Sequence, residues 1–515
     1  MLRISLTQLM STLLYIALGS ALFTQPLYAA VNDNDLIVKT QSGTVQGAST
    51  SVANRWLGMP YAQPPVGKLR WKSPQPVMAW QGIKQATQFG DSCMQTPPPK
   101  GPEAQLKTQP MSENCLTLNV WQPKKVSDKA KLPVMVWIHG GAFRLGASSL
   151  PLYDGSHLAQ QGVIVVSLNY RLGVFSVLPV PAIVKERHNK PLNLGLLDQI
   201  AALNWVNKNI AQFGGDPDNV TIWGESAGGA SVGYLLQSPQ SKGLFSKAIM
   251  ESGALALPEF TTSQAMAHIT KQLPKSILNA SFDELQGMSA QQLLKLPVAK
   301  TATMPVVDNI SLKESTQTAI ALGHFHHVPL LIGSNNYEAG FFPPAWVNSL
   351  PNKLGTLWNE AQTLTDGYGT ETKTLKAAQL ATDIFATSPT QRFAASASQY
   401  TPTWRYYFSY VTPTHRETQP GAIHTGEIPY VFGNLATQLN PVTKQDEQLS
   451  QRMTARWAQF AKTGNPNPQG LPKWPQWQKD VATLWSFNNQ QDKVIHEPSK
   501  ERLDFVSRHK DIQMN

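Results

Sequence analysis

The chain has 515 residues, 41% of them hydrophobic, and a formal net charge of +10, which allows a large core in one elaborated domain or in two or three. Its lysines and arginines are scattered, with no run longer than Lys124-Lys125, and this pattern argues against a nucleic-acid partner. The two cysteines lack a CxxC spacing, and the cluster His324, His326 and His327 lacks a companion motif, so we expect no metal site.

The first 30 residues have the features of a secretory signal peptide. Arg3 precedes an apolar stretch from Leu13 to Phe23, and the small residues Ala29 and Ala30 come before a polar segment. The apolar stretch is shorter than the ~20 residues that a membrane span needs. We therefore expect cleavage rather than a retained anchor, no stable membrane insertion, and a mature chain, 31–515, that is secreted or periplasmic.

Cys93 and Cys115 are close in the sequence. In an exported chain such a pair favours one disulfide, which would close a loop of about 20 residues and contribute about 3 kcal/mol in the loop-entropy model.

Short runs of apolar and β-branched residues predict buried parallel strands. These runs are Val134–Ile138, Val163–Leu168, Val220–Trp223, Ala248–Met250 and Val328–Ile332, with Trp404–Val411 as a further strand. A helix is predicted over Leu196–Phe213, where apolar residues recur every three or four positions and two glycines follow. Alternating strands and helices favour an α/β fold with a mostly parallel sheet covered on both faces. Residues 258–400 carry fewer strand patterns, and we expect a largely helical region over the sheet.

Ser226 lies at the centre of Gly224-Glu225-Ser226-Ala227-Gly228, directly after a predicted strand. Glycines two positions before and after a serine permit a sharp strand-to-helix turn that exposes the serine as a nucleophile. Such a short pattern is weak evidence alone. A serine nucleophile needs a histidine to accept its proton and a carboxylate to orient that histidine.

Candidate partners follow later strands, in the order serine, acid, histidine that an α/β-hydrolase requires. Glu338 comes just after the predicted strand Val328–Ile332, and Asp308 and Glu251 are alternative acids. His415 and His424 both follow the strand Trp404–Val411, and spacing does not separate them.

Donors for a developing oxyanion are predicted at a second turn. The strand Val134–Ile138 leads into His139-Gly140-Gly141-Ala142-Phe143, whose backbone N–H groups resemble those of an HGGG-type turn. The N–H group of Ala227, the residue after the serine, is a further donor. Two motifs that each follow a strand indicate acyl-transfer chemistry.

The chain resembles the type-B carboxylesterase family, which includes para-nitrobenzyl-type esterases, animal carboxylesterases and cholinesterases. The resemblance extends from about Ile37 to Trp477. Its ordered motifs are Gly58–Ala62, Pro64–Gly67, Arg70-Trp71, Ser112–Val120, His139–Phe143, Asn169–Arg171, Gly195–Gln199, Phe213–Pro217, Gly224–Gly228 and Gly421–Ile428.

The resemblance implies an α/β-hydrolase fold and assigns the site residues. The catalytic triad is Ser226, Glu338 and His424, and the oxyanion hole is Gly141, Ala142 and Ala227. It also implies the Cys93–Cys115 disulfide and two structural ion pairs, Arg70 with Glu113 and Arg171 with Asp198. His139 is not expected to act as a base.

The resemblance predicts a serine hydrolase that cleaves a small-molecule carboxylic ester through an acyl-enzyme, without a cofactor. A lipase or an amidase would use the same residues, and a non-catalytic recognition protein is a further alternative. Residues 94–114 contain no Phe, Tyr or Trp, so the aromatic residue that supports choline in cholinesterases is missing and a choline ester is not expected.

Overall fold

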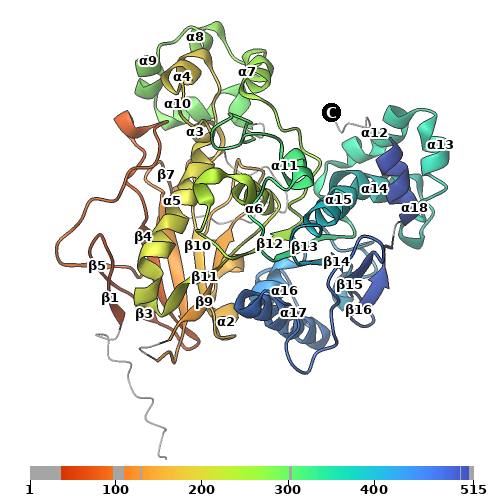
Figure 1. The fold of residues 1–515 in the computed structure, drawn as a ribbon. Helices are drawn as coiled ribbons and strands as arrows, with labels where there is room; N and C mark the ends of the chain where they lie inside the picture. The colour runs from red at the N-terminus through yellow and green to blue at the C-terminus, as the bar shows by residue number, and fades with distance from the viewer. Residues whose placement is uncertain (1–35, 97–109, 128–129, 301–303, 499, 510–515) are drawn as a thin grey trace, which may run out of the picture. The chain divides into compact units, whose positions relative to one another are not determined.

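A sheet of eleven strands runs through the computed structural model, which describes residues 36–96, 110–127, 130–300, 304–498 and 500–509 (Figure 1). The predicted signal peptide lies outside these residues. The described residues from Ile37 onward belong to one unit. Among the described residues, no helix combines the length and the apolar character needed to cross a bilayer.

The central strands of the sheet are parallel, from β10 across to β15, and the strands at both edges are antiparallel. In sheet order the strands are β16 (Lys493–His496), β15 (Thr483–Phe487), β14 (Thr403–Phe408), β13 (Leu330–Asn335), β12 (Lys247–Glu251), β11 (Gly215–Glu225), β9 (Leu132–Ile138), β10 (Ile164–Leu168), β8 (Thr117–Pro123), β4 (Ala53–Pro60) and β3 (Ala48–Ser49). Two small sheets are formed by β1 (Ile37–Lys39), β2 (Thr44–Gln46) and β5 (Ile83–Gln85), and by β6 (Ser92–Cys93) and β7 (Met111–Ser112).

The α-helices that precede residue 258 are α2 (Ser156–Ala159), α3 (Gly173–Ser176), α4 (Pro181–Glu186), α5 (Leu194–Asn209) and α6 (Ala227–Gln237). Those within residues 258–400 are α7 (Thr262–Thr270), α8 (Lys275–Leu278), α9 (Phe282–Gly287), α10 (Ala290–Leu294), α11 (Thr316–Leu322), α12 (Pro344–Leu354), α13 (Leu357–Ala361), α14 (Lys373–Thr382) and α15 (Ser388–Ala397). The last are α16 (Ile428–Phe432), α17 (Lys444–Thr463) and α18 (Lys500–Arg508).

Helices cover both faces of the sheet because side chains alternate along each strand. Trp137, Trp223 and Ile249 pack with α2, α16 and α17 in one core. Met250, the neighbour of Ile249, lies on the other face, where its Cε atom is 3.3 Å from an ideal Cβ position on Gly233 of α6. Helices α5, α11 and α15 pack beside α6 or on the adjoining strands of that face.

The predicted strands are present with shifted ends. The prediction over Val220–Trp223 captures only the last part of β11, because the strand extends back to Gly215 through an irregular register. The predicted helix ends early: α5 stops at Asn209, and a 3₁₀ turn, Ile210–Phe213, follows before Gly214 closes it with a φ of 76°. Helices α7 to α15 occupy much of residues 258–400, but strand β13 of the central sheet lies within this region.

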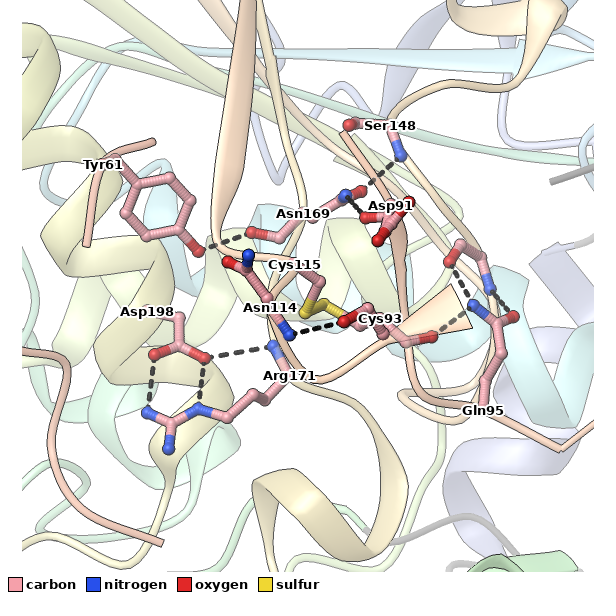
Figure 2. The surroundings of a disulfide bond; sticks show 12 residues. Tyr61, Asp91, Cys93, Gln95, Asn114, Cys115, Ser148, Asn169, Arg171 and Asp198 are labelled. Carbon is pink, nitrogen blue, oxygen red and sulfur yellow. Dashed lines mark hydrogen bonds and ion pairs between the residues drawn. A yellow bond between two sulfur atoms is a disulfide. The ribbon is translucent and has the colours of Figure 1, made fainter. Parts of the chain in front are cut away.

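The disulfide between Cys93 and Cys115 is formed, as predicted (Figure 2). Close by, the guanidinium of Arg171 donates two hydrogen bonds to the carboxylate of Asp198, at 2.8 and 2.7 Å (Figure 2). The pair is almost completely buried.

The second expected ion pair is also present. The Nε atom of Arg70 donates to Glu113 at 2.7 Å, two residues before Cys115. The guanidinium of Arg70 additionally donates to the backbone oxygens of Gln286 and Met288, so it ties residues near the disulfide to the region around α9.

Candidate active site

Ser226 lies between the end of β11 and the first residue of α6, at the carboxyl edge of the sheet. Its backbone has a φ of 56° and a ψ of −123°, a conformation that non-glycine residues rarely adopt. The turn is held from both sides, since the N–H of Ser226 donates to the carbonyl of Glu251 and its own carbonyl accepts from Ala230. Ser226 is largely buried, with 8% of the residue exposed.

The two flanking glycines are required by contacts with the neighbouring strand. A Cβ on Gly224 would lie 2.6 Å from the carbonyl oxygen of Ile138, and one on Gly228 would lie 1.9 Å from the same atom. Both distances are impossible for real side chains. The sterics inferred from the Gly-x-Ser-x-Gly spacing are therefore confirmed: α6 approaches β9 so closely that only glycine fits.

The turn after β9 adjoins Ser226. A Cβ on Gly140 would lie 3.1 Å from the Cβ atom of Ser226. Gly141, Ala142 and Phe143 all have positive φ angles, of 110°, 55° and 56°. This strained run turns the N–H groups of Gly141 and Ala142 away from regular secondary structure, and within the described part of the chain neither donates to an acceptor.

The N–H of Ala227 has no partner within its helix because Ala227 is the first residue of α6. Like the N–H groups of Gly141 and Ala142, it is available to form a hydrogen bond with a ligand. Three available donors beside a serine are the arrangement that stabilises an oxyanion.

Glu338 is fully buried at the end of β13, where it begins a 3₁₀ turn. Its Oε2 atom accepts a hydrogen bond of 2.6 Å from Nδ1 of His424. Its Oε1 atom accepts from the hydroxyl of Ser252 at 2.6 Å and from the N–H of Asn335 at 2.8 Å. The carboxylate is thus fixed on one side and orients the imidazole on the other.

Asn335 and Asn336 attach the loop that carries His424 to the end of β13. The side-chain amide of Asn335 donates to the carbonyl of Ile423 at 2.7 Å. The side-chain oxygen of Asn336 accepts a hydrogen bond from the N–H of Ala422, at 2.6 Å. His424 is positioned through its backbone as well as through Glu338.

The other nitrogen of the imidazole, Nε2 of His424, lies 3.2 Å from Oε1 of Glu225. This contact is within ion-pair distance but lacks hydrogen-bond geometry. The hydroxyl of Ser226 makes no hydrogen bond to the residues that the structure describes. Bonds between a nucleophile and its base are often long or misaligned before a substrate binds.

Three buried glutamates act on the charge of this imidazole: Glu225, Glu338 and Glu427. Burial lowers the pKa of His424, but the negative charges of Glu225 and Glu338 raise it by more, so the net shift is upward. Burial also raises the pKa of Glu225, and His424 opposes that shift. Burial and the negative charge of Glu338 likewise raise the pKa of Glu427, and His424 opposes that shift.

The two alternative acids for the triad, Asp308 and Glu251, have other hydrogen-bond partners. Asp308 accepts backbone N–H groups of its own loop and of Leu192, and Glu251 accepts the indole N–H of Trp457 at 2.7 Å. His415 ends a 3₁₀ turn, and only His424 of the two histidines contacts Glu338.

His139, which was not expected to act as a base, is buried against the ring of Tyr170 at 4.6 Å between centroids. Burial lowers the pKa of His139 to about 4, although its bond to the carbonyl of Gly140 opposes the shift.

Several residues of the site were not identified from the sequence: Ser252, Asn335, Asn336, Glu225 and Glu427. A weak signal existed for the first three, because polar residues directly after buried strands collect at the carboxyl edge of a parallel sheet. Glu225 and Glu427 lie within the motifs Gly224–Gly228 and Gly421–Ile428, but these motifs alone assign neither residue a role in the site.

A solved structure of a PNB esterase matches with a TM-score of 0.76 and 37% sequence identity, covering 91% of this chain and 99% of that one. A thermophilic PNB esterase matches with a TM-score of 0.77 and 38% identity over the same shares. The chain has the α/β-hydrolase fold.

The sequence profile of the carboxylesterase family matches residues 34–371 and 356–506. A para-nitrobenzyl esterase from Bacillus subtilis (strain 168) is 41% identical over 470 residues, which cover 86% of this chain and 93% of that protein. A fumonisin B1 esterase from Sphingopyxis macrogoltabida is 35% identical over 511 residues, covering 92% and 91%. The chain belongs to the carboxylesterase family, and it is a serine hydrolase of carboxylic esters.

Proposed function

We propose that this esterase uses Ser226 as nucleophile, His424 as general base and acid, and Glu338 as the residue that orients His424. The observation that carries the proposal is the 2.6 Å bond between Nδ1 of His424 and Oε2 of Glu338, beside the strained turn that holds Ser226. This bond fixes the imidazole tautomer so that Nε2 is left to accept a proton.

In the acylation step, Nε2 of His424 removes the proton of the Ser226 hydroxyl while Oγ attacks the ester carbonyl. The negative charge on the former carbonyl oxygen is stabilised by the N–H groups of Gly141, Ala142 and Ala227. His424 then returns the proton to the leaving alcohol. A water molecule repeats the sequence on the acyl-enzyme and releases the carboxylic acid.

The substrate is proposed to be a small ester with apolar groups. Phe341 lies over the imidazole of His424, with ring centroids 5.0 Å apart, and 46% of Phe341 is exposed. Ile423 is 41% exposed beside the same histidine. Apolar side chains at the approach to a polar centre favour uncharged, partly hydrophobic esters over charged ones.

Phe341 belongs to residues 258–400, which we propose as the region that shapes substrate access. We further propose that residues 1–30 are a signal peptide, that residues 31–515 are one catalytic domain, and that the mature enzyme is secreted or periplasmic. The disulfide supports an oxidising location.

The experiment that tests the substrate class is hydrolysis of para-nitrophenyl esters from acetate to palmitate. Fast turnover of short and medium chains is the expected result. A rate maximum at palmitate, increasing when the substrate forms an interface, would favour a lipase. Turnover of the matching anilides at comparable rates would favour an amidase.

A further inference from the structure

A row of residues in register crosses four neighbouring strands at the carboxyl end of the sheet (Figure 1). Glu225 of β11 pairs with Glu251 of β12, Glu251 pairs with Gly333 of β13, and Gly333 pairs with Tyr406 of β14. Residues in register on adjacent strands lie on the same face of a sheet. Trp223, two positions before Glu225, belongs to the core that α16 and α17 share. The row therefore faces these helices.

The glycine in this row brings Tyr406 close to the two glutamates. A Cβ on Gly333 would lie 2.3 Å from the ring of Tyr406, so the ring occupies the space that a side chain would fill. Burial, and then the charges of Glu427 and Glu251, raise the pKa of Tyr406. Glu427 is the residue directly before α16. We call Glu225, Glu251, Glu427 and Tyr406 the acidic cluster.

The acidic cluster is sealed from water and has little positive charge. Each of its four residues is at most 1% exposed. Among the described residues, no lysine or arginine forms an ion pair with the cluster, and only His424 lies within ion-pair distance, beside Glu225. Burial of several carboxyl groups beside one imidazole favours a proton on one of them.

Glu251 is the carboxyl group of the cluster with the weakest support for a negative charge. Its Oε1 atom accepts one bond, from the neutral indole of Trp457 at 2.7 Å. Burial, and after it the charge of Glu427, raises the pKa of Glu251 well above its ordinary value, although the bond from Trp457 opposes the shift.

Glu427 has better support for its charged form. Its Oε2 atom accepts the side-chain amide of Asn335 at 2.6 Å, and its own backbone N–H also favours the carboxylate. Within the described part of the chain, Oε2 of Glu251 and Oε1 of Glu427 both lack a hydrogen-bond partner. One proton on Oε2 of Glu251 would give both of these buried oxygens a bond.

We propose that Glu251 is a positioning residue of the esterase reaction, which holds a proton on Oε2 throughout the active pH range and donates it in a hydrogen bond to Glu427. Glu427 stays ionised and holds Asn335, whose side-chain amide also holds the carbonyl of Ile423 at 2.7 Å. The proton thereby connects β12 to the loop that carries His424. This inference rests on the proposed role of His424 as the base.

The direct test is infrared spectroscopy of the full-length mature protein in heavy water, at the pH of maximal activity. A protonated carboxyl group has a C=O stretching band that a carboxylate lacks. Glu251→Gln is expected to remove one such band from the wild-type spectrum. Glu417→Gln, which changes an exposed carboxylate, is the control and is expected to remove none. Ser226→Ala is expected to keep the band, because this proton takes no part in the chemistry.

Two replacements of Glu251 then measure what the proton does. Glu251→Gln keeps an oxygen for Trp457 and an N–H donor for Glu427, so kcat is expected to stay within about twofold of the wild-type value, with the acid limb of kcat/KM in place. Glu251→Leu has no donor, so Glu427 is expected to take up a proton. We expect kcat to fall about tenfold with little change in KM, and the acid limb to move to lower pH because a negative charge near His424 is lost.

Two outcomes would show that Glu251 is ionised and would overturn the proposal: no band lost in Glu251→Gln, or an acid limb that moves down in this variant as expected for Glu225→Gln. Equal kcat values in the folded Gln and Leu variants would also overturn it, because the donor would then have no role. If the Leu variant does not fold, the band and the pH profile of Glu251→Gln decide. Failure of the proposed triad gives a different result, since folded Ser226→Ala would then retain turnover whatever the state of Glu251.

Discussion

Oε1 of Glu225 lies 3.2 Å from Nε2 of His424, the nitrogen that the proposed mechanism uses to accept the proton of Ser226. The residue next to the nucleophile thus stabilises the charged form of the base. A base acts only when it is neutral, so a raised His424 pKa is expected to place the acid limb of the activity profile at a high pH.

Replacement of Glu225 by Gln removes one of the charges that raise the pKa of His424. The lower pKa keeps the imidazole neutral at lower pH, so the acid limb of kcat/KM is expected to move down by about one pH unit or more. The control is Glu417→Gln, which changes an exposed carboxylate of the loop before His424. An acid limb that stays in place in Glu225→Gln would show that this contact does not tune the base.

Replacement of Glu338 by Gln is expected to lower kcat by about 10³- to 10⁴-fold with little change in thermal stability. The amide oxygen would keep accepting from Ser252 and Asn335, so the amide NH₂ would face Nδ1 of His424 and impose the wrong tautomer. Steady-state kinetics and a melting curve measure the two quantities. A kcat within tenfold of the wild-type value, in a folded protein, would remove Glu338 from the mechanism.

Gly141→Ala is expected to lower kcat by about 10²-fold or more, because it disturbs an oxyanion donor. The new Cβ would lie 2.1 Å from the carbonyl oxygen of Leu145, at a φ of 110° that alanine disfavours. Gly287→Ala is the matched control, since no atom lies within 4 Å of its ideal Cβ position. Similar kcat values in the two variants would argue against Gly141 as part of the oxyanion hole.

Arg171→Met is expected to lower the free energy of unfolding by about 3–5 kcal/mol, because it leaves the buried carboxylate of Asp198 without its partner. Arg508→Met breaks an exposed pair with Glu360 and is expected to leave stability within the error of a urea titration. If both variants unfold at the same urea concentration, the buried pair has no special structural role.

Features governed by local sterics could be predicted from the sequence. The glycines at positions 224 and 228 indicate a close helix–strand approach, and β12 and β13 follow from their apolar runs. The start of β11 could not be predicted, because residues near Gly215 pair with Leu132 through an irregular register that no periodicity encodes.

The assignment of His424 depends on long-range contacts. Its distinction from His415 is made in the fold by the bonds from Asn335 to Ile423 and from His424 to Glu338, between segments more than 80 residues apart. The sequence supplied this choice only through the family resemblance. The contact between Glu225 and His424 likewise depends on how two loops meet at the edge of the sheet.

The most direct test of the proposed mechanism is labelling with a fluorophosphonate probe, followed by mass spectrometry of the peptides. The proposed roles predict a single phosphonylated residue, Ser226, with loss of ester hydrolysis in proportion to labelling, and no labelling or turnover in folded Ser226→Ala. Labelling at another serine, or wild-type turnover in Ser226→Ala, would contradict the assignment of the nucleophile and with it the triad.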